Sequence, residues 1–358
     1  MNYRNFVCVL LLVLSGNGRM QSQAPERATS SAPTSAIAQP QTSQVARASD
    51  ADLSQARLLL RQGKYDEAIS ELQNLSAAKP YLKGLDHEFG MAYYAKGEYA
   101  KAIEYLKKAQ QEDAADNEAV QLLGLSYYLS GRPAEAILFL EKVQTWYPRA
   151  NVDAAYILGV CYIQNKQYPQ ARKAFAKMFE VGPESAASYL FTARMLLRQE
   201  FEPVAEEYAQ KAIELDPKLP LAHFLLGELY LFKSRLPEAI AELQKELAIN
   251  PGYAPGYYKL ADAYSRVQKY EDAERLLQRS IWLDATATGP YILMGKVLEK
   301  KGEFELALRA LQRAAAMDPN NPMTHHLLGQ TYRDLGRAAD AERELHEGER
   351  LQAGQDKQ

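Results

Sequence analysis

Apolar and small residues recur along the chain at spacings that predict pairs of helices. The pattern is clearest at residues 288–321, where two helical segments of apolar residues flank a turn at Gly302. Glycine suits the left-handed backbone that ends a helix, and Pro319 cannot continue the second segment. The small residues Gly295 and Ala307 let two helices approach closely. We therefore expect an antiparallel helical hairpin in this stretch.

The hairpin pattern repeats along most of the chain. The small residue of the first helix recurs with a step of 34 residues, apart from one step of 35 between Gly124 and Gly159. It occurs at Ala56, Gly90, Gly124, Gly159, Ala193, Gly227, Ala261, Gly295 and Gly329. Each copy is followed twelve positions later by an alanine, and six copies are followed three positions later by a tyrosine. Because one hairpin cannot bury its apolar face alone, successive copies must stack.

This combination of small residue, tyrosine, alanine and stop proline at a period of 34 resembles the tetratricopeptide repeat family. The resemblance covers roughly residues 49–355. It implies an all-α fold, namely a right-handed superhelical solenoid of nine helical hairpins with a concave groove lined by the first helices. The family's frequent tryptophan near the start of the repeat is absent, but the packing positions are present.

The N-terminal residues do not follow the repeat. Residues 1–18 indicate a secretory signal peptide, because Arg4 precedes an unbroken apolar run from Phe6 to Leu14 and small polar residues follow. The run is too short to span a bilayer. The sequence therefore predicts an exported protein, periplasmic or secreted, with no stable membrane span after cleavage and a membrane tether if the signal is retained. A start-site artefact or a buried helix is the alternative.

The remaining segments are assigned by composition. Residues 19–48 are rich in Ser, Ala, Gln and Pro and have almost no large apolar residue, which predicts a disordered linker. The nine-repeat domain is expected at 49–355, followed by a tail at 356–358. A net charge of −3 provides no global basic field for nucleic acid.

The chain lacks the residue patterns of catalytic, cofactor and metal sites. None of its five histidines has a metal-binding spacing, and there is no glycine-rich phosphate loop. Cys161 is expected to be a small buried hydrophobe. Ten of the 23 tyrosines fall on repeated packing positions and are expected in the core. We therefore expect no enzyme activity, no cofactor and no metal.

The resemblance also places the groove. In the family it is lined at positions three before and one, four and five after the small residue of each first helix. These positions are largely aromatic and aliphatic from the second repeat to the sixth, and charged beyond it. The partner-binding residues expected there are Met91, Tyr94, Tyr128, Tyr156, Arg194, Arg198, Phe224, Glu228, Phe232, Tyr258, Arg266, Lys296 and Lys300.

A contiguous apolar strip flanked by arginines is typical of a partner surface. The sequence therefore predicts a non-catalytic scaffold that binds an extended peptide or a partner helix. By resemblance, the setting is an envelope or secretion-related assembly. Three alternatives stay open: tight packing that covers the strip, a module that stacks glycan or cell-wall polymer on the aromatics, and an enzyme or regulatory subunit. No stretch outside the repeats is left to hold a catalytic domain.

Overall fold

The computed structural model describes residues 42–146, 152–199 and 202–355. The contacts separate Met1–Ala48 from a compact unit at Ser49–Gln358, and the repeats lie in the second unit. The expected signal peptide, the linker up to residue 41 and the tail at 356–358 lie outside the described residues. So do residues 147–151, which lie within the 35-residue step between Gly124 and Gly159.

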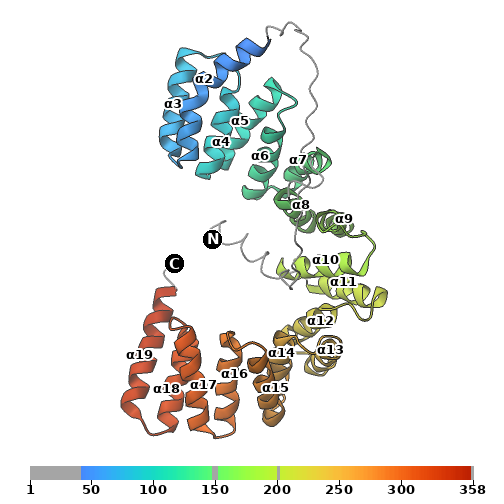
Figure 1. Ribbon diagram of the computed structural model, residues 1–358, viewed down its shortest axis with the longest axis vertical. Helices are drawn as coiled ribbons and strands as arrows, with labels where there is room; N and C mark the ends of the chain where they lie inside the picture. Colours follow the sequence, from blue (N-terminus) through green and yellow to red (C-terminus); the bar gives the residue numbers. More distant parts are fainter. Residues whose placement is uncertain (1–41, 147–151, 200–201, 356–358) are drawn as a thin grey trace, which may run out of the picture. The chain divides into compact units, whose positions relative to one another are not determined.

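The described residues form eighteen α-helices and no strand, arranged as nine successive hairpins (Figure 1). The first helices are α2 (Thr42–Arg61), α4 (Leu85–Lys96), α6 (Asn117–Leu129), α8 (Val152–Gln164), α10 (Ala186–Arg198), α12 (Ala222–Phe232), α14 (Ala254–Arg266), α16 (Thr288–Lys300) and α18 (Pro322–Asp334). The second helices are α3 (Tyr65–Ala78), α5 (Tyr99–Glu112), α7 (Pro133–Trp146), α9 (Tyr168–Met178), α11 (Glu202–Leu215), α13 (Leu236–Ile249), α15 (Tyr270–Leu283), α17 (Phe304–Met317) and α19 (Ala338–Gln355). The predicted all-α solenoid of nine hairpins is confirmed.

Helix α2 begins at Thr42, so residues 42–48 of the predicted linker are helical. The last proline before this helix is Pro40, and the residues that follow include alanine, glutamine and arginine, which favour helix. The low apolar content of residues 42–48 therefore led to a wrong prediction of where the linker ends and α2 begins.

Each hairpin depends on a close approach between its two helices. A Cβ atom placed on Gly295 would lie 2.5 Å from Leu311 Cγ, and one placed on Gly227 would lie 2.6 Å from Leu243 Cγ. Both leucines are fully buried. The recurring small residue is thus explained by the leucine that fills the space beside it.

The turn has a left-handed residue in the eight hairpins whose turn residue the structure describes. Gly302 has φ 77°, as its sequence predicts. The same position is also left-handed in three repeats where it is not glycine, namely at Lys166, Ser234 and Gln268. The repeat geometry therefore imposes this conformation even on side chains that disfavour it.

Polar contacts connect successive hairpins where one ends and the next begins. His223 Nε2 lies 3.2 Å from the carbonyl oxygen of Pro217, and the Tyr257 hydroxyl donates to Pro251 O at 3.1 Å. The buried Glu246 carboxylate accepts from the backbone N–H of Leu221 at 3.0 Å, just before α12. The first two contacts join α12 and α14 to the segment that follows the preceding second helix, whereas Glu246 joins the start of α12 to α13 of the same hairpin.

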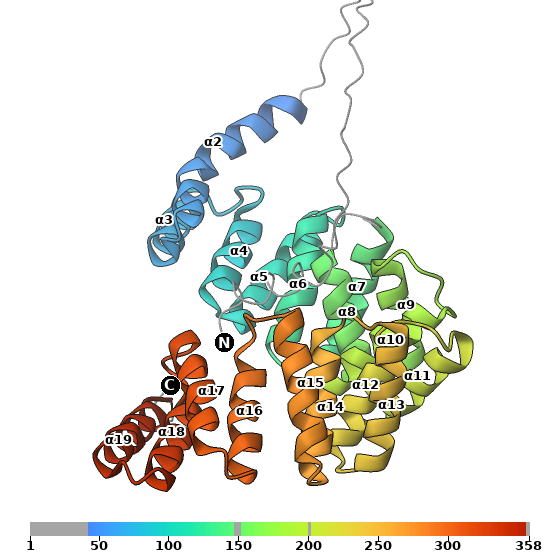
Figure 2. The ribbon, with the colours of Figure 1, turned by 60° about the horizontal axis from the view of Figure 1, so that its bottom comes forward.

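Successive first helices also contact one another directly. Such contacts join α4 to α6, α6 to α8, α12 to α14, α14 to α16 and α16 to α18. Figure 2 shows the C-terminal hairpins from a second direction. Residues at equivalent positions of these neighbouring first helices therefore lie side by side, which creates a surface that we call the first-helix face.

Candidate partner-binding face

The first-helix face is largely closed between α4 and α8. Leu125 is 8% exposed, and Val160 and Ile163 are 1% and 0% exposed. The predicted groove residues of this half are half-buried, namely Met91, Tyr94, Tyr128 and Tyr156, and the three tyrosines pack against the core. The apolar strip that the sequence predicts as a partner surface is therefore mainly used in packing between hairpins here.

Phe224 requires a correction. It was predicted to line the groove, but it is only 6% exposed and lies in the core of α12. The ring of Tyr253, in the segment before α14, meets it edge-on with ring centroids 5.0 Å apart. The repeat positions identified the first-helix residue but not the aromatic residue of the next hairpin that covers it.

The face becomes charged from α10 onwards. At the position five residues after the small residue, four successive first helices carry Arg198, Phe232, Arg266 and Lys300, and all four are exposed. We call these residues the exposed row. Phe232 is 73% exposed, which is unusual for a large apolar side chain. The contacts of α14 with α12 and α16 place the ring of Phe232 on the same face as Arg266 and Lys300.

Ion pairs fix part of this charged half. Lys259 Nζ on α14 lies 3.0 Å from Glu228 Oε1 on α12, so the pair joins neighbouring first helices. Arg266 Nη2 lies 2.8 Å from Asp262 Oδ2, and its Nη1 donates to Leu231 O at 3.2 Å. Arg266 is therefore held in place, and its charge is balanced within its own helix.

The predicted residues beside these pairs differ in exposure. Arg194 is exposed, whereas Tyr258 and Lys296 are half-buried. Burial raises the pKa of Tyr258, so its hydroxyl stays protonated. A Cβ atom on Gly289 would come within 3.2 Å of the Tyr258 ring, which shows that the start of α16 packs closely on it.

A small cavity of about 280 Å³ lies between α16 and α18, at the end of the exposed row. It is lined by Glu299, Lys300, Gln330, Arg333 and Asp334. The Glu299 carboxylate accepts a hydrogen bond from the hydroxyl of the buried Thr331. Burial raises the pKa of Glu299. The cavity therefore holds two cations, Lys300 and Arg333, and two carboxylates, of which Glu299 is already hydrogen-bonded.

A second charged group lies on α4, at the other end of the repeats. His87 Nδ1 lies 2.6 Å from Asp116 Oδ2, and His87 Nε2 lies 3.6 Å from Glu118 Oε2. Burial alone would lower the pKa of His87, but its contacts with Glu118 and Asp116 raise it to about 9. His87 is therefore an imidazolium at neutral pH, and its carboxylate partners make it a structural link between α4 and the start of α6.

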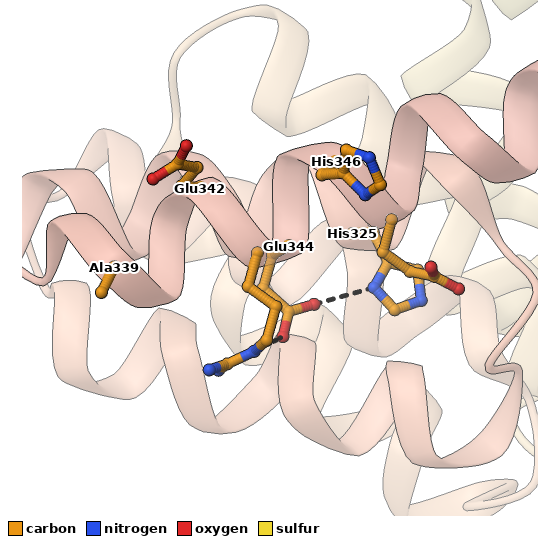
Figure 3. A pocket seen from close by; sticks show the side chains of 7 residues that line it. His325, Ala339, Glu342, Glu344 and His346 are labelled. Atoms are coloured by element: carbon orange, nitrogen blue, oxygen red, sulfur yellow. Dashed lines mark hydrogen bonds and ion pairs between the residues drawn. The ribbon is translucent and has the colours of Figure 1, made fainter.

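A cavity of about 630 Å³ lies on the last hairpin (Figure 3). Its charged side chains are mainly paired: His325 Nδ1 lies 2.8 Å from Glu344 Oε2, and Arg343 pairs with Asp340 at 2.8 Å. Glu342 occupies the same repeat position in the last hairpin that the buried Leu308 occupies in the hairpin before it. This surface is thus the hydrated end of the stack, as the polar sequence of α19 predicts.

The described residues contain no group of three His, Cys, Asp or Glu side chains placed to hold a metal ion. Cys161 is fully buried, and burial raises the pKa of its thiol to about 12, so it is not a thiolate nucleophile at neutral pH. Within the part of the chain that the structure describes, no helix has the length and apolarity needed to cross a membrane.

Two features of the site were missed by sequence reasoning. Lys259, which pairs with Glu228, stands two positions before the small residue and was not among the groove positions considered. Tyr253 lies in the segment between hairpins, outside the expected helices. The positive charge of Lys259 and the aromatic ring of Tyr253 differ from the residues at the equivalent positions of other repeats, and this difference could have identified both residues from the sequence.

Models of tetratricopeptide repeats match the chain in several stretches. Two described as "Tetratricopeptide repeat" match residues 25–82, 165–220, 193–254 and 257–291, and one described as "TPR repeat" matches 295–336. The model of "Anaphase-promoting complex, cyclosome, subunit 3" matches 95–178. No curated protein matches the chain by sequence.

Several solved structures resemble this one. PilF of Pseudomonas aeruginosa is 20% identical, with coverage of 58% of this chain and 97% of that chain and a TM-score of 0.47. MamA from Desulfovibrio magneticus RS-1 is 19% identical, with coverage of 48% and 97% and a TM-score of 0.45. YrrB, described as a TPR protein with an unusual peptide-binding site, is 24% identical, with coverage of 51% and 94% and a TM-score of 0.44.

Proposed function

Because this chain is a tetratricopeptide-repeat protein, we propose that it is a non-catalytic scaffold that binds an extended segment of a protein partner. The segment would lie on the first-helix face of α10 to α18. The observation that supports this most directly is the exposed row Arg198, Phe232, Arg266 and Lys300. An accessible aromatic residue with neighbouring arginines has the composition of a binding hot spot.

The structure of the face favours a protein segment over a glycan or cell-wall polymer. Of the aromatic residues predicted for the groove, only Phe232 is exposed, and the tyrosines are half-buried in packing. Stacking along a polymer requires several accessible rings in succession. Charged groups at fixed repeat positions, in contrast, suit the side chains of an extended peptide.

The proposed setting is an envelope or secretion-related assembly outside the cytoplasm. This part of the proposal is supported by the sequence from Arg4 to Leu14, with its charge followed by an apolar run. A fusion of the N-terminal residues to a reporter that is active only after export would test it. A reporter that remains inactive would contradict the proposed export.

Site-specific photocrosslinking tests the binding proposal. A benzophenone amino acid would replace Phe232 or Lys300 in the full chain, and Arg313, which is exposed on the second helix α17, would be the control position. We expect a partner protein to be crosslinked from positions 232 and 300, with the contacts mapped to one short stretch of its sequence. A partner crosslinked only from position 313, or contacts scattered over its surface, would refute binding on the first-helix face.

A further inference from the structure

The charges on the exposed half of the first-helix face are not balanced locally. Its acidic residues Glu228 and Asp262 already pair with Lys259 and Arg266. In the described part of the chain, Arg198, Lys300 and Arg333 form no ion pair within the usual contact distance. The face therefore has cations available to an incoming anion, and, apart from the hydrogen-bonded Glu299, the carboxylate that remains beside Lys300 and Arg333 without an ion pair in the described residues is Asp334.

Several second helices balance their cations differently. Lys211 pairs with Glu214 at 2.8 Å, and Lys245 pairs with Glu242 at 2.7 Å. On α19, Arg343 pairs with Asp340 at 2.8 Å. Such pairs, three residues apart on a helix, are the ordinary arrangement of a solvated surface. Arg309 and Arg313 on α17 are also exposed cations without an ion pair among the described residues. Lys300 and Arg333 differ from them because they line one cavity together, on the same face as Phe232.

Helix spacing limits the shape of a segment that could follow the row. Neighbouring packed helices lie roughly 8–10 Å apart, so Phe232 on α12 and Lys300 on α16 are separated by roughly 16–20 Å. A polyproline II segment rises about 3.1 Å per residue and repeats its orientation every three residues. Residues six positions apart in such a segment therefore point the same way at about 19 Å, which matches two helix steps.

We infer that the bound segment is extended and acidic, with an apolar residue on Phe232 and carboxylates about six to nine positions away, at Lys300 and Arg333. This inference rests on the proposed function and specifies the chemistry of its partner. The cavity of about 280 Å³ between α16 and α18 gives the carboxylates a place beside both cations. The buried, hydrogen-bonded Glu299 forms part of its lining.

Fluorescence polarisation with the full chain tests the inference. The probe is a labelled Pro- and Ser-rich peptide with one leucine and a Glu-Glu pair six positions later, and its comparator has Gln-Gln instead. The variant Lys300→Gln/Arg333→Gln removes two cations from the face. Arg309→Gln/Arg313→Gln removes two exposed cations from α17 and is the matched control for net charge.

We expect the acidic peptide to bind and its Gln-Gln comparator to bind much more weakly. Lys300→Gln/Arg333→Gln should weaken binding roughly 2- to 30-fold, because exposed charge pairs contribute roughly 0.2–1 kcal/mol each. Phe232→Ser should also weaken it, and Arg309→Gln/Arg313→Gln should leave it unchanged. Added salt should weaken binding to the wild-type chain.

Other outcomes would overturn the inference. Equal binding of the two peptides would exclude recognition of carboxylates, and equal loss in both double variants would indicate attraction by net charge alone. Equal or tighter binding of a single-stranded oligonucleotide, sensitive to the same variant, would assign the face to a nucleic acid. If no acidic peptide binds but a partner still crosslinks from positions 232 and 300, the acidic chemistry fails while the proposed scaffold function stands.

Discussion

The contact between Gly227 and Leu243 allows a sharp test of why the repeat needs a small residue. In α12, a Cβ atom on Gly227 would lie 2.6 Å from Leu243 Cγ and 2.8 Å from Cδ2. Carbon atoms in ordinary contact are about 3.5–4.0 Å apart. The change Gly227→Ala therefore requires a displacement of about 1 Å at a leucine that is fully buried.

Two effects of Gly227→Ala oppose each other. Overpacking in a well-filled core costs about 1–3 kcal/mol. Alanine is favoured over glycine in a helix interior by about 0.8–1.0 kcal/mol. The free energy of unfolding should therefore fall by about 0–2 kcal/mol, which by itself would not separate the two effects.

A double-mutant cycle separates them through a change of sign. Leu243→Ala alone should cost about 2–5 kcal/mol, because it leaves a cavity beside Gly227. In that background the new methyl group has room, so Gly227→Ala should be stabilising by about 1 kcal/mol through helix propensity. The coupling energy should then be about 1–3 kcal/mol.

Urea unfolding followed by circular dichroism gives the free energies, and hydrogen exchange of peptides from α12 and α13 locates the change. Gly252→Ala is the control, since nothing lies within 4 Å of its added Cβ atom. If Gly227→Ala has the same effect in both backgrounds to within about 0.5 kcal/mol, the steric explanation of the small residue is wrong.

Three further predictions concern the junctions and turns. Glu246→Leu should cost about 2–4 kcal/mol in urea unfolding, because the N–H of Leu221 loses its buried acceptor, and Glu246→Gln should cost less. The hydrogen bond to Glu242 raises the pKa of His223 above 6.5, so its contribution is complete below that pH and is lost as pH rises through the folded pKa. The difference in free energy of unfolding between wild type and His223→Gln should therefore shrink as pH rises. A difference that grows with pH would contradict this prediction. Gln268→Gly should raise the melting temperature, because a left-handed backbone with φ 62° is less favourable for glutamine than for glycine by about 1–2 kcal/mol. A lower melting temperature of Gln268→Gly would refute this prediction.

The fold was predictable because the repeat fixes both helices of each hairpin at once. The small residue at Gly295, its leucine at Leu311 and the turn at Gly302 all have the structural roles that their spacing predicts. The same period could have predicted the left-handed turn at Lys166, where residue type alone gives no indication. Helix ends were less predictable, since α2 continues from Thr42 through residues that have no apolar pattern.

The candidate site was less predictable because exposure depends on the neighbouring hairpin. Phe224 and Phe232 both occupy expected groove positions of α12, yet they are 6% and 73% exposed. The difference arises because Tyr253, from the following segment, covers Phe224. A single repeat gives no information about that contact, whereas the pairing of Glu228 with Lys259 joins adjacent repeats and could be sought as complementary charges.

The same reasoning explains why one half of the first-helix face is closed and the other exposed. At the position one residue after the small residue, Leu125 and Val160 are apolar and are buried between hairpins. Arg194, Glu228 and Lys296 occupy that position later in the chain, and burying such charges without partners is unfavourable. The change from apolar to charged residues therefore marks where the face stays hydrated. A partner bound there would gain apolar contact mainly from Phe232 and electrostatic attraction from the surrounding cations, so its affinity should be moderate and should depend strongly on salt.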